Sequence, residues 1–249
     1  MSTATGQGQV VDTEAAQEFM REARRLIQEP ELDGIAEELA VKSRRFRELL
    51  DQEALRGLSG DQLRSLLRTI FAARRHCDEV LAQVGEERWR KSLWSLLHDP
   101  VPVTQRIDAF DLELAAIDPG IRRDVAGEAL HFFDPERYWL WTRWIWDPEI
   151  GTGALPLVTM EEHDLSADSP GATYLRVGEG IAFVNQTGRS VGFTRFGEEA
   201  FGVDVYLACV YGVYLYTITR IRMTQEFNKV IPPLPQLARR LLGVHRMEV

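Results

Sequence analysis

Apolar side chains recur every three or four residues through most of the first 146 positions of the chain. Leu63, Leu66 and Ile70 are one example, and this spacing places them on one face of a helix, which has 3.6 residues per turn. Residues 59–62 follow the S-x-x-Q pattern of a capping box directly before that run. Pro- and Gly-containing turns separate the periodic runs. The pattern predicts a layer of packed helices over residues 13–146.

The pattern changes after position 146. Residues 147–170 are rich in Gly, Pro, Asp and Ser, and they predict a long loop. Three short runs that follow alternate in polarity or carry β-branched and aromatic residues, with Gly- and Asn-rich turns between them. These runs are 173–177, 181–184 and 190–193. They predict a small antiparallel β-meander, which must pack on the helices because three strands alone are marginally stable in water.

The C-terminal part returns to helical spacing. Residues 203–227 predict a long helix and residues 234–242 a short one. The apolar run 205–218 is shorter than the roughly 20 residues of a membrane span and carries four tyrosines, so we expect a buried helix of a soluble protein. The predicted fold is therefore mainly α, a multi-helix domain with a small antiparallel β-meander before the last long helix. The predicted segments are a disordered tail over 1–12 and one domain over 13–249, composed of helices over 13–146, a loop and β-insert over 147–197, and C-terminal helices over 203–243.

Four of the six tryptophans lie between positions 139 and 146. Asp134 and Pro135 suit the N-cap and first turn of a helix, so this aromatic segment predicts a helix. It has two interpretations. It is either a core helix whose indole N–H groups find local acceptors, or a docking surface, because Trp, Tyr and Arg dominate the energetics of protein interfaces.

The formal net charge of -9 makes the field of the whole molecule repel polyanions, which disfavours nucleic-acid and acidic-lipid binding except at a local basic patch. Residues 74–76, with the sequence Arg-Arg-His, are either such an anion site or a charged turn of surface helix. Cys77 and Cys209 are far apart and lack a C-x-x-C pattern, which is typical of reduced thiols in a cytoplasmic protein. The N-terminus lacks the basic start and apolar run of a secretory signal.

Only one motif suggests metal chemistry. Glu128 and His131 form an E-x-x-H pattern, half of the motif of carboxylate-bridged di-iron sites, and the sequence contains no second copy. The acidic cluster over 161–164 fits no metal template. The sequence also lacks a phosphate-binding Gly-rich loop and a Gly-x-Ser-x-Gly motif. We therefore predict no cofactor and no catalytic residues, with Glu128 and His131 as the alternative metal ligands.

The segment over about 114–145, LAAIDPGIRRDVAGEALHFFDPERYWLWTRWI, resembles the helix-hairpin-helix region of the base-excision DNA glycosylases. The resemblance implies a hairpin at Pro119-Gly120 and a nucleic-acid-binding surface that includes Arg122, Arg123 and Arg137. The chemistry of that family is not matched. Arg122 replaces the second hairpin glycine, Arg123 stands where bifunctional members place a lysine nucleophile, and positions 141–143 lack the expected aspartate.

Three functions remain open on this basis. The first is a non-enzymatic cytoplasmic interaction or accessory protein that binds a protein partner, or itself, through an aromatic- and Arg-rich helical surface. The second is a nucleic-acid-binding protein without glycosylase chemistry, and the third is a metal-dependent enzyme that uses Glu128 and His131. The residues assigned to the partner surface are Trp139, Arg143, Trp146, Tyr211 and Tyr214.

Overall fold

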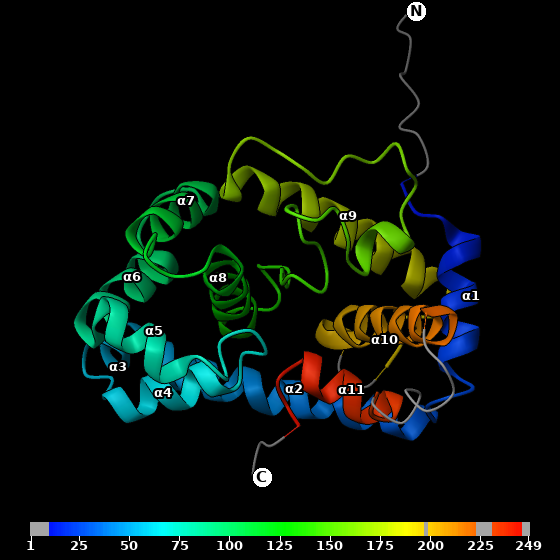
Figure 1. Cartoon of the computed structure of the whole chain (residues 1–249), viewed down its shortest axis with the longest axis horizontal. Helices are drawn as coiled ribbons and strands as arrows, with labels where there is room; N and C mark the ends of the chain where they lie inside the picture. Colours follow the sequence, from blue (N-terminus) through cyan, green and yellow to red (C-terminus); the bar gives the residue numbers. More distant parts are fainter. Residues whose placement is uncertain (1–9, 197–198, 223–230, 246–249) are drawn as a thin grey trace, which may run out of the picture.

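The computed structural model describes residues 10–196, 199–222 and 231–245. Eleven α-helices and two short 3-10 helices make up its regular structure, and the described residues contain no β-strand. Figure 1 shows α8 inside the left half of the molecule, with α1, α10 and α11 grouped at the right. The α-helices are α1 (Thr13–Ala23), α2 (Glu29–Leu50), α3 (Gln52–Arg56), α4 (Gly60–Arg68), α5 (Cys77–Val84), α6 (Glu86–His98), α7 (Val103–Glu113), α8 (Pro119–Phe133), α9 (Pro170–Val191), α10 (Gly202–Arg222) and α11 (Leu234–Leu241).

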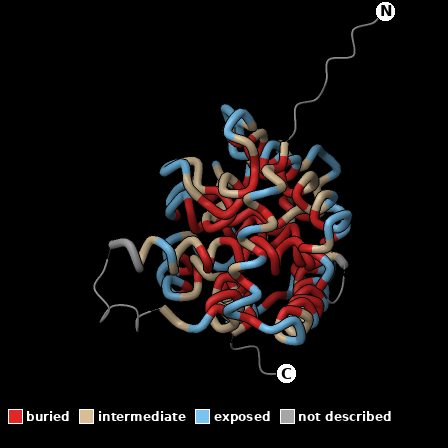
Figure 2. Tube along the Cα trace, turned by 90° about the vertical axis from the view of Figure 1, so that its right-hand side faces the viewer, coloured by how far each residue is buried: buried red, intermediate tan, exposed pale blue. Residues whose placement is uncertain are grey.

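Helix α8 is the centre of the fold. Asp118 caps its N-terminus by accepting the backbone N–H of Ile121, and Pro119 occupies the first turn. Every residue from Gly120 to Phe132 except Arg123 is buried. A helix buried on all sides must satisfy its polar side chains inside the protein. Helices α2, α6 and α7 pack against it, and Figure 2 shows the buried chain running through the middle of the molecule.

The predicted β-meander is wrong, because residues 170–191 form the single helix α9. Ser169 caps it by accepting the N–H of Ala172, and Pro170 stands in its first turn. Its buried side chains, among them Tyr174, Val177, Ile181 and Val184, recur at helical spacing.

The glycines that suggest turns in the sequence are contact points inside α9. A Cβ at Gly178 would come within 3.0 Å of the Trp139 ring, and one at Gly180 within 3.1 Å of Leu155. Glycine is tolerated there because the neighbouring side chains need the space. The β-branched and aromatic content of α9 had suggested strands, but the helical period of its apolar face decides the outcome.

The aromatic segment, residues 134–146, is also not a helix, although most of it from Tyr138 onward is buried. Two short turns in it are closed by its own backbone, at Asp134 and at Thr142, and other backbone groups bond to other elements. His131 bonds the carbonyl of Tyr138, the Tyr174 hydroxyl donates to the carbonyl of Trp139, and the N–H of Arg143 donates to Asp124. Because tertiary partners satisfy these groups, the segment can cross the core in an irregular conformation.

Close contact with α8 holds the aromatic segment in place. A Cβ at Gly127 would lie only 1.9 Å from the backbone oxygen of Trp141, so only glycine allows the two backbones to touch there. The indole N–H of Trp141 donates to the carbonyl of Trp146, whereas those of Trp144 and Trp146 are buried without a hydrogen-bond partner among the described residues, so the core interpretation is met only in part.

The end of the predicted N-terminal tail is packed against the fold, and α10 is buried as expected. Residues 1–9 of the predicted tail lie outside the described residues, whereas Val11 pairs with Thr159 and Asp12 caps α1. At the other end, α10 includes one 18-residue window, Gly202–Thr219, that is long and apolar enough to cross a membrane. That window is 61% buried inside the protein, where α10 packs against α1, α9 and α11, as a core helix of a soluble protein does.

Candidate functional site

Glu128 and His131, the two candidate metal ligands, lie in separate buried ion pairs. The Nζ of Lys42 lies 2.5 Å from Glu128 Oε2, and the Nε2 of His131 lies 2.8 Å from Asp204 Oδ2. All four side chains are at most 2% exposed. Within the described residues, no three His, Cys, Asp or Glu side chains gather as a metal site would require.

His131 is held between two acceptors. Its Nδ1 lies 2.8 Å from the carbonyl oxygen of Tyr138, and its Nε2 faces the Asp204 carboxylate. Burial lowers the pKa of His131, but the Asp204 carboxylate outweighs that effect and leaves the pKa raised. The pair therefore connects α8, the aromatic segment and α10 through a charged bond in the core.

Asp124 is a third buried carboxyl on α8. It accepts the backbone N–H of Arg143 at 2.8 Å, and the Arg143 guanidinium lies 3.8 Å away. Burial raises the pKa of Asp124 to about 7, despite the opposing effect of Arg143. Its acceptor role anchors the aromatic segment to α8.

The five residues assigned to a partner surface do not form one face. Trp146 is buried, and Trp139 is half-buried beside Gly178 in a groove next to α9. Arg143 lies against the start of α8. Tyr211 and Tyr214 lie together on α10, with ring centroids 6.0 Å apart.

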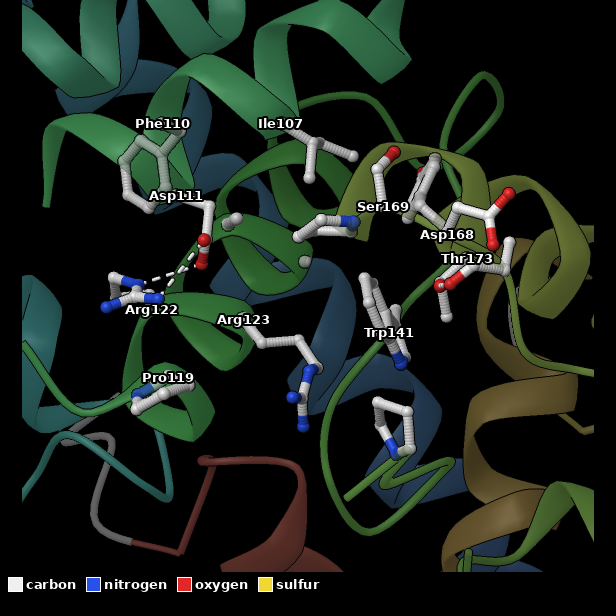
Figure 3. Close-up of a pocket in the computed structure, with 16 residues that line it drawn as sticks. Ile107, Phe110, Asp111, Pro119, Arg122, Arg123, Trp141, Asp168, Ser169 and Thr173 are labelled. Carbon is white, nitrogen blue, oxygen red and sulfur yellow. Dashed lines mark hydrogen bonds and ion pairs between the residues drawn. The ribbon is translucent and has the colours of Figure 1, made fainter. Parts of the chain in front are cut away.

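The three arginines assigned to nucleic acid are likewise separated. Arg122 and Arg123 line the cavity shown in Figure 3, whereas Arg137 lines the groove that contains Trp139. Arg122 forms a two-point ion pair with Asp111 at 2.8 and 3.1 Å. Arg123 lies 3.3 Å from both Asp147 and Glu149, so neither charge is available to a phosphate without exchange of partners.

The structure instead gathers arginines at a cavity of about 570 Å³ between α2, α4, the turn after α4 and the C-terminal end of α11. We call it the arginine cavity. Five arginines and one histidine line it, and the lining contains no Asp or Glu. The lining residues are Arg45, Ser65, Arg68, Thr69, Phe71, Arg74, Arg75, Arg240, Gly243 and His245.

The turn over residues 69–76 supplies four of the ten lining residues. The apolar run that begins at Leu63 does not continue as one helix, because α4 ends at Arg68 and α5 begins only at Cys77. Arg74 and Arg75 therefore lie in a turn. The Arg74 guanidinium lies 4.6 Å from the ring centroid of Phe71, and Arg45 donates to the Ser65 hydroxyl at 2.7 Å.

Lys42 links the turn after α4 to the segment after α11, the two sides of the arginine cavity. Besides Glu128, its Nζ donates to the carbonyl of Thr69 at 3.3 Å and to that of Leu242 at 2.8 Å. Gly243 has a φ of +75°, and a Cβ there would lie 1.7 Å from the Thr69 oxygen. Only glycine fits this close contact between the turn and the C-terminal segment.

The electrostatics of the arginine cavity differ from those of the rest of the molecule. Many arginines elsewhere lie against a carboxylate, as Arg239 does with Glu38 at 2.9 Å. In the described part of the chain, Arg68, Arg75 and Arg240 form no ion pair. Several positive charges at one concave site repel one another, and an anion would relieve that repulsion.

Comparison with known proteins gives no relative from which to transfer a role. No family model matches the chain, no curated protein matches it, and no solved structure matches its fold. The resemblance to the helix-hairpin-helix glycosylases therefore stays a prediction. Sequence reasoning pointed to Arg74 and Arg75 as a possible anion site but had no signal for Arg45, Arg68 or Arg240, because their convergence depends on how distant helices pack.

Proposed function

We propose that this protein binds a compact ligand with several negative charges, such as a polyphosphate or phosphate ester, at the arginine cavity. The convergence of five arginines without a carboxylate in the lining carries the proposal. Guanidinium groups match phosphate oxygens with paired hydrogen bonds, and they keep their charge at any physiological pH. The cavity volume of about 570 Å³ lies in the range of small-molecule sites.

A compact ligand is favoured over a nucleic-acid polymer. The net charge of -9 makes the field of the molecule as a whole repel a long polyanion. In addition, Arg122 and Arg123, which would extend a nucleic-acid surface, are already paired with carboxylates. The role is that of an accessory protein that recognises a phosphorylated small molecule, and the proposal includes no catalytic step.

A cytoplasmic location fits this role. Cys77 and Cys209 are free and buried, as is common in a reducing compartment. Phosphorylated small molecules are also present in the cytoplasm.

Isothermal titration with tripolyphosphate at low ionic strength tests the proposal. Arg68 and Arg75 are exposed, so their replacement should leave the fold intact. A charge-assisted hydrogen bond contributes about 1.5–3 kcal/mol, so Arg68→Ala and Arg75→Ala should each weaken binding by roughly tenfold or more. Arg88→Ala is the matched control, because this arginine on α6 is also exposed and does not line the cavity.

Two results would contradict the proposal. One is the absence of saturable binding, and the other is an equal loss in all three variants. A single-stranded oligonucleotide titrated in parallel distinguishes the ligand class. If it binds more tightly than tripolyphosphate and depends on the same arginines, the site serves nucleic acid instead.

A further inference from the structure

A second cavity, separate from the arginine cavity, lies between α7, α8, the aromatic segment and the start of α9 (Figure 3). Its volume is about 230 Å³. Ile107, Phe110, Ala126, Trp141 and Tyr174 supply much of its apolar lining. We call it the tryptophan cavity.

The aromatic rings of the tryptophan cavity offer carbon surface rather than hydrogen bonds. The indole N–H of Trp141 donates to the carbonyl of Trp146 at 3.0 Å. The hydroxyl of Tyr174 donates to the carbonyl of Trp139 at 3.2 Å. Because their polar atoms are bonded elsewhere, both rings can contact a ligand through apolar faces and edges, which suits an aromatic body.

The two arginines in the lining do not make the cavity a site for anions. Besides its ion pair with Asp111, Arg122 donates to the carbonyl of Ile117 at 2.6 Å. Arg123 lies between two carboxylates, and its guanidinium stands 5.4 Å from the ring centroid of Trp141. Asp168 lies exposed at the edge of the cavity in Figure 3 and forms no ion pair within the described residues. The local charge therefore favours a neutral or positively charged ligand over a negative one.

Backbone contacts on two sides keep the tryptophan cavity open. Gly127 of α8 touches the backbone of Trp141, and a Cβ at Gly171 of α9 would lie 2.1 Å from the backbone oxygen of Thr104. The walls cannot move inward without breaking these contacts, so the space is preformed. A cavity of about 150 Å³ accepts benzene in another protein, so this one has room for two fused rings.

We infer that the tryptophan cavity binds a one- or two-ring aromatic molecule that carries no negative charge. The ring system contacts Trp141, Phe110 and Tyr174. A polar or cationic substituent points toward Asp168 at the edge. This site is independent of the arginine cavity, so either one can be correct without the other.

Saturation-transfer NMR titrations with three related probes test this inference: indole, tryptamine and indole-3-acetate. Indole and tryptamine should bind saturably, with tryptamine at least as tight. Indole-3-acetate should bind about tenfold more weakly than tryptamine, because its carboxylate meets Asp168 and finds no uncompensated cation.

Ala167→Trp provides the matching variant. Ala167 is an exposed residue on the edge of the cavity, so a large side chain there fills the entrance without disturbing the core. We expect about tenfold weaker indole binding, whereas Ala82→Trp, on the exposed surface of α5, should leave the affinity within about twofold. The inference is overturned if indole and tryptamine show no saturable binding up to about 5 mM, if Ala167→Trp binds indole as the wild type does, or if indole-3-acetate binds most tightly.

Discussion

The buried ion pair between Lys42 and Glu128 gives the sharpest test of how this fold is held together. It links α2 to α8, and through the carbonyls of Thr69 and Leu242 it also links the two walls of the arginine cavity. Burial lowers the pKa of Lys42 and raises that of Glu128, and each partner offsets part of the shift in the other. Neither charge has access to water, so each depends on the other.

The expected magnitude follows from this geometry. Lys42→Met removes all three hydrogen bonds of the ammonium and leaves a buried carboxylate, which should lower the free energy of unfolding by about 3–5 kcal/mol at pH 7. Glu128→Met leaves a buried ammonium and should cost a similar amount. In the double variant Lys42→Met/Glu128→Met no charge is buried without a partner, so the two effects should be far from additive, with a coupling energy of about 2 kcal/mol or more.

Equilibrium unfolding in urea measures the three variants and the wild type. The pH dependence provides a second check. Without Lys42 the pKa of Glu128 rises further. A carboxyl whose pKa is higher in the folded than in the unfolded protein makes the protein less stable as pH rises. The loss in Lys42→Met should therefore be smaller at pH 5 than at pH 8. Single variants that each cost less than about 1 kcal/mol and add up in the double variant would refute the reasoning.

Further predictions concern the contacts of α8 and a helix surface. Burial raises the pKa of Asp124 to about 7, so ionisation of this group should lower the free energy of unfolding by up to about 4 kcal/mol as pH rises from 4 to 7. Asp124→Asn keeps an acceptor for the backbone N–H of Arg143 and does not ionise. The urea midpoint of this variant should therefore fall less over that pH range than the wild-type midpoint. Gly127→Ala should lower the free energy of unfolding by about 3 kcal/mol or more, because the added Cβ would lie 1.9 Å from the backbone oxygen of Trp141. Thermal unfolding of the variant measures this loss. Gly34→Ala in α2 is the control: its Cβ meets nothing closer than 3.8 Å, so it should raise stability by about 0.5–1 kcal/mol, and a loss equal to that of Gly127→Ala would contradict the packing argument.

The local elements with strong end signals could be predicted from the sequence. The capping box at residues 59–62 is present as expected, and the helical spacing placed α10 and α11 close to their positions. These features depend on residues within one or two helical turns of each other, so they can be recognised from sequence spacing.

The arrangement of the sites was decided by tertiary packing. Glycines that suggest turns in α9 are contact points for Trp139 and Leu155, and the aromatic segment is irregular because distant groups satisfy its backbone. Arg68 and Arg240 lie more than 170 positions apart in the sequence, and the packing of α11 on α2 together with the contact of Gly243 with Thr69 places them in one cavity. The sequence alone determined the mainly helical class and the capping box of α4, because those depend on local spacing. Which charges meet, which are neutralised and which stay available to a ligand depends on long-range contacts that no local pattern encodes.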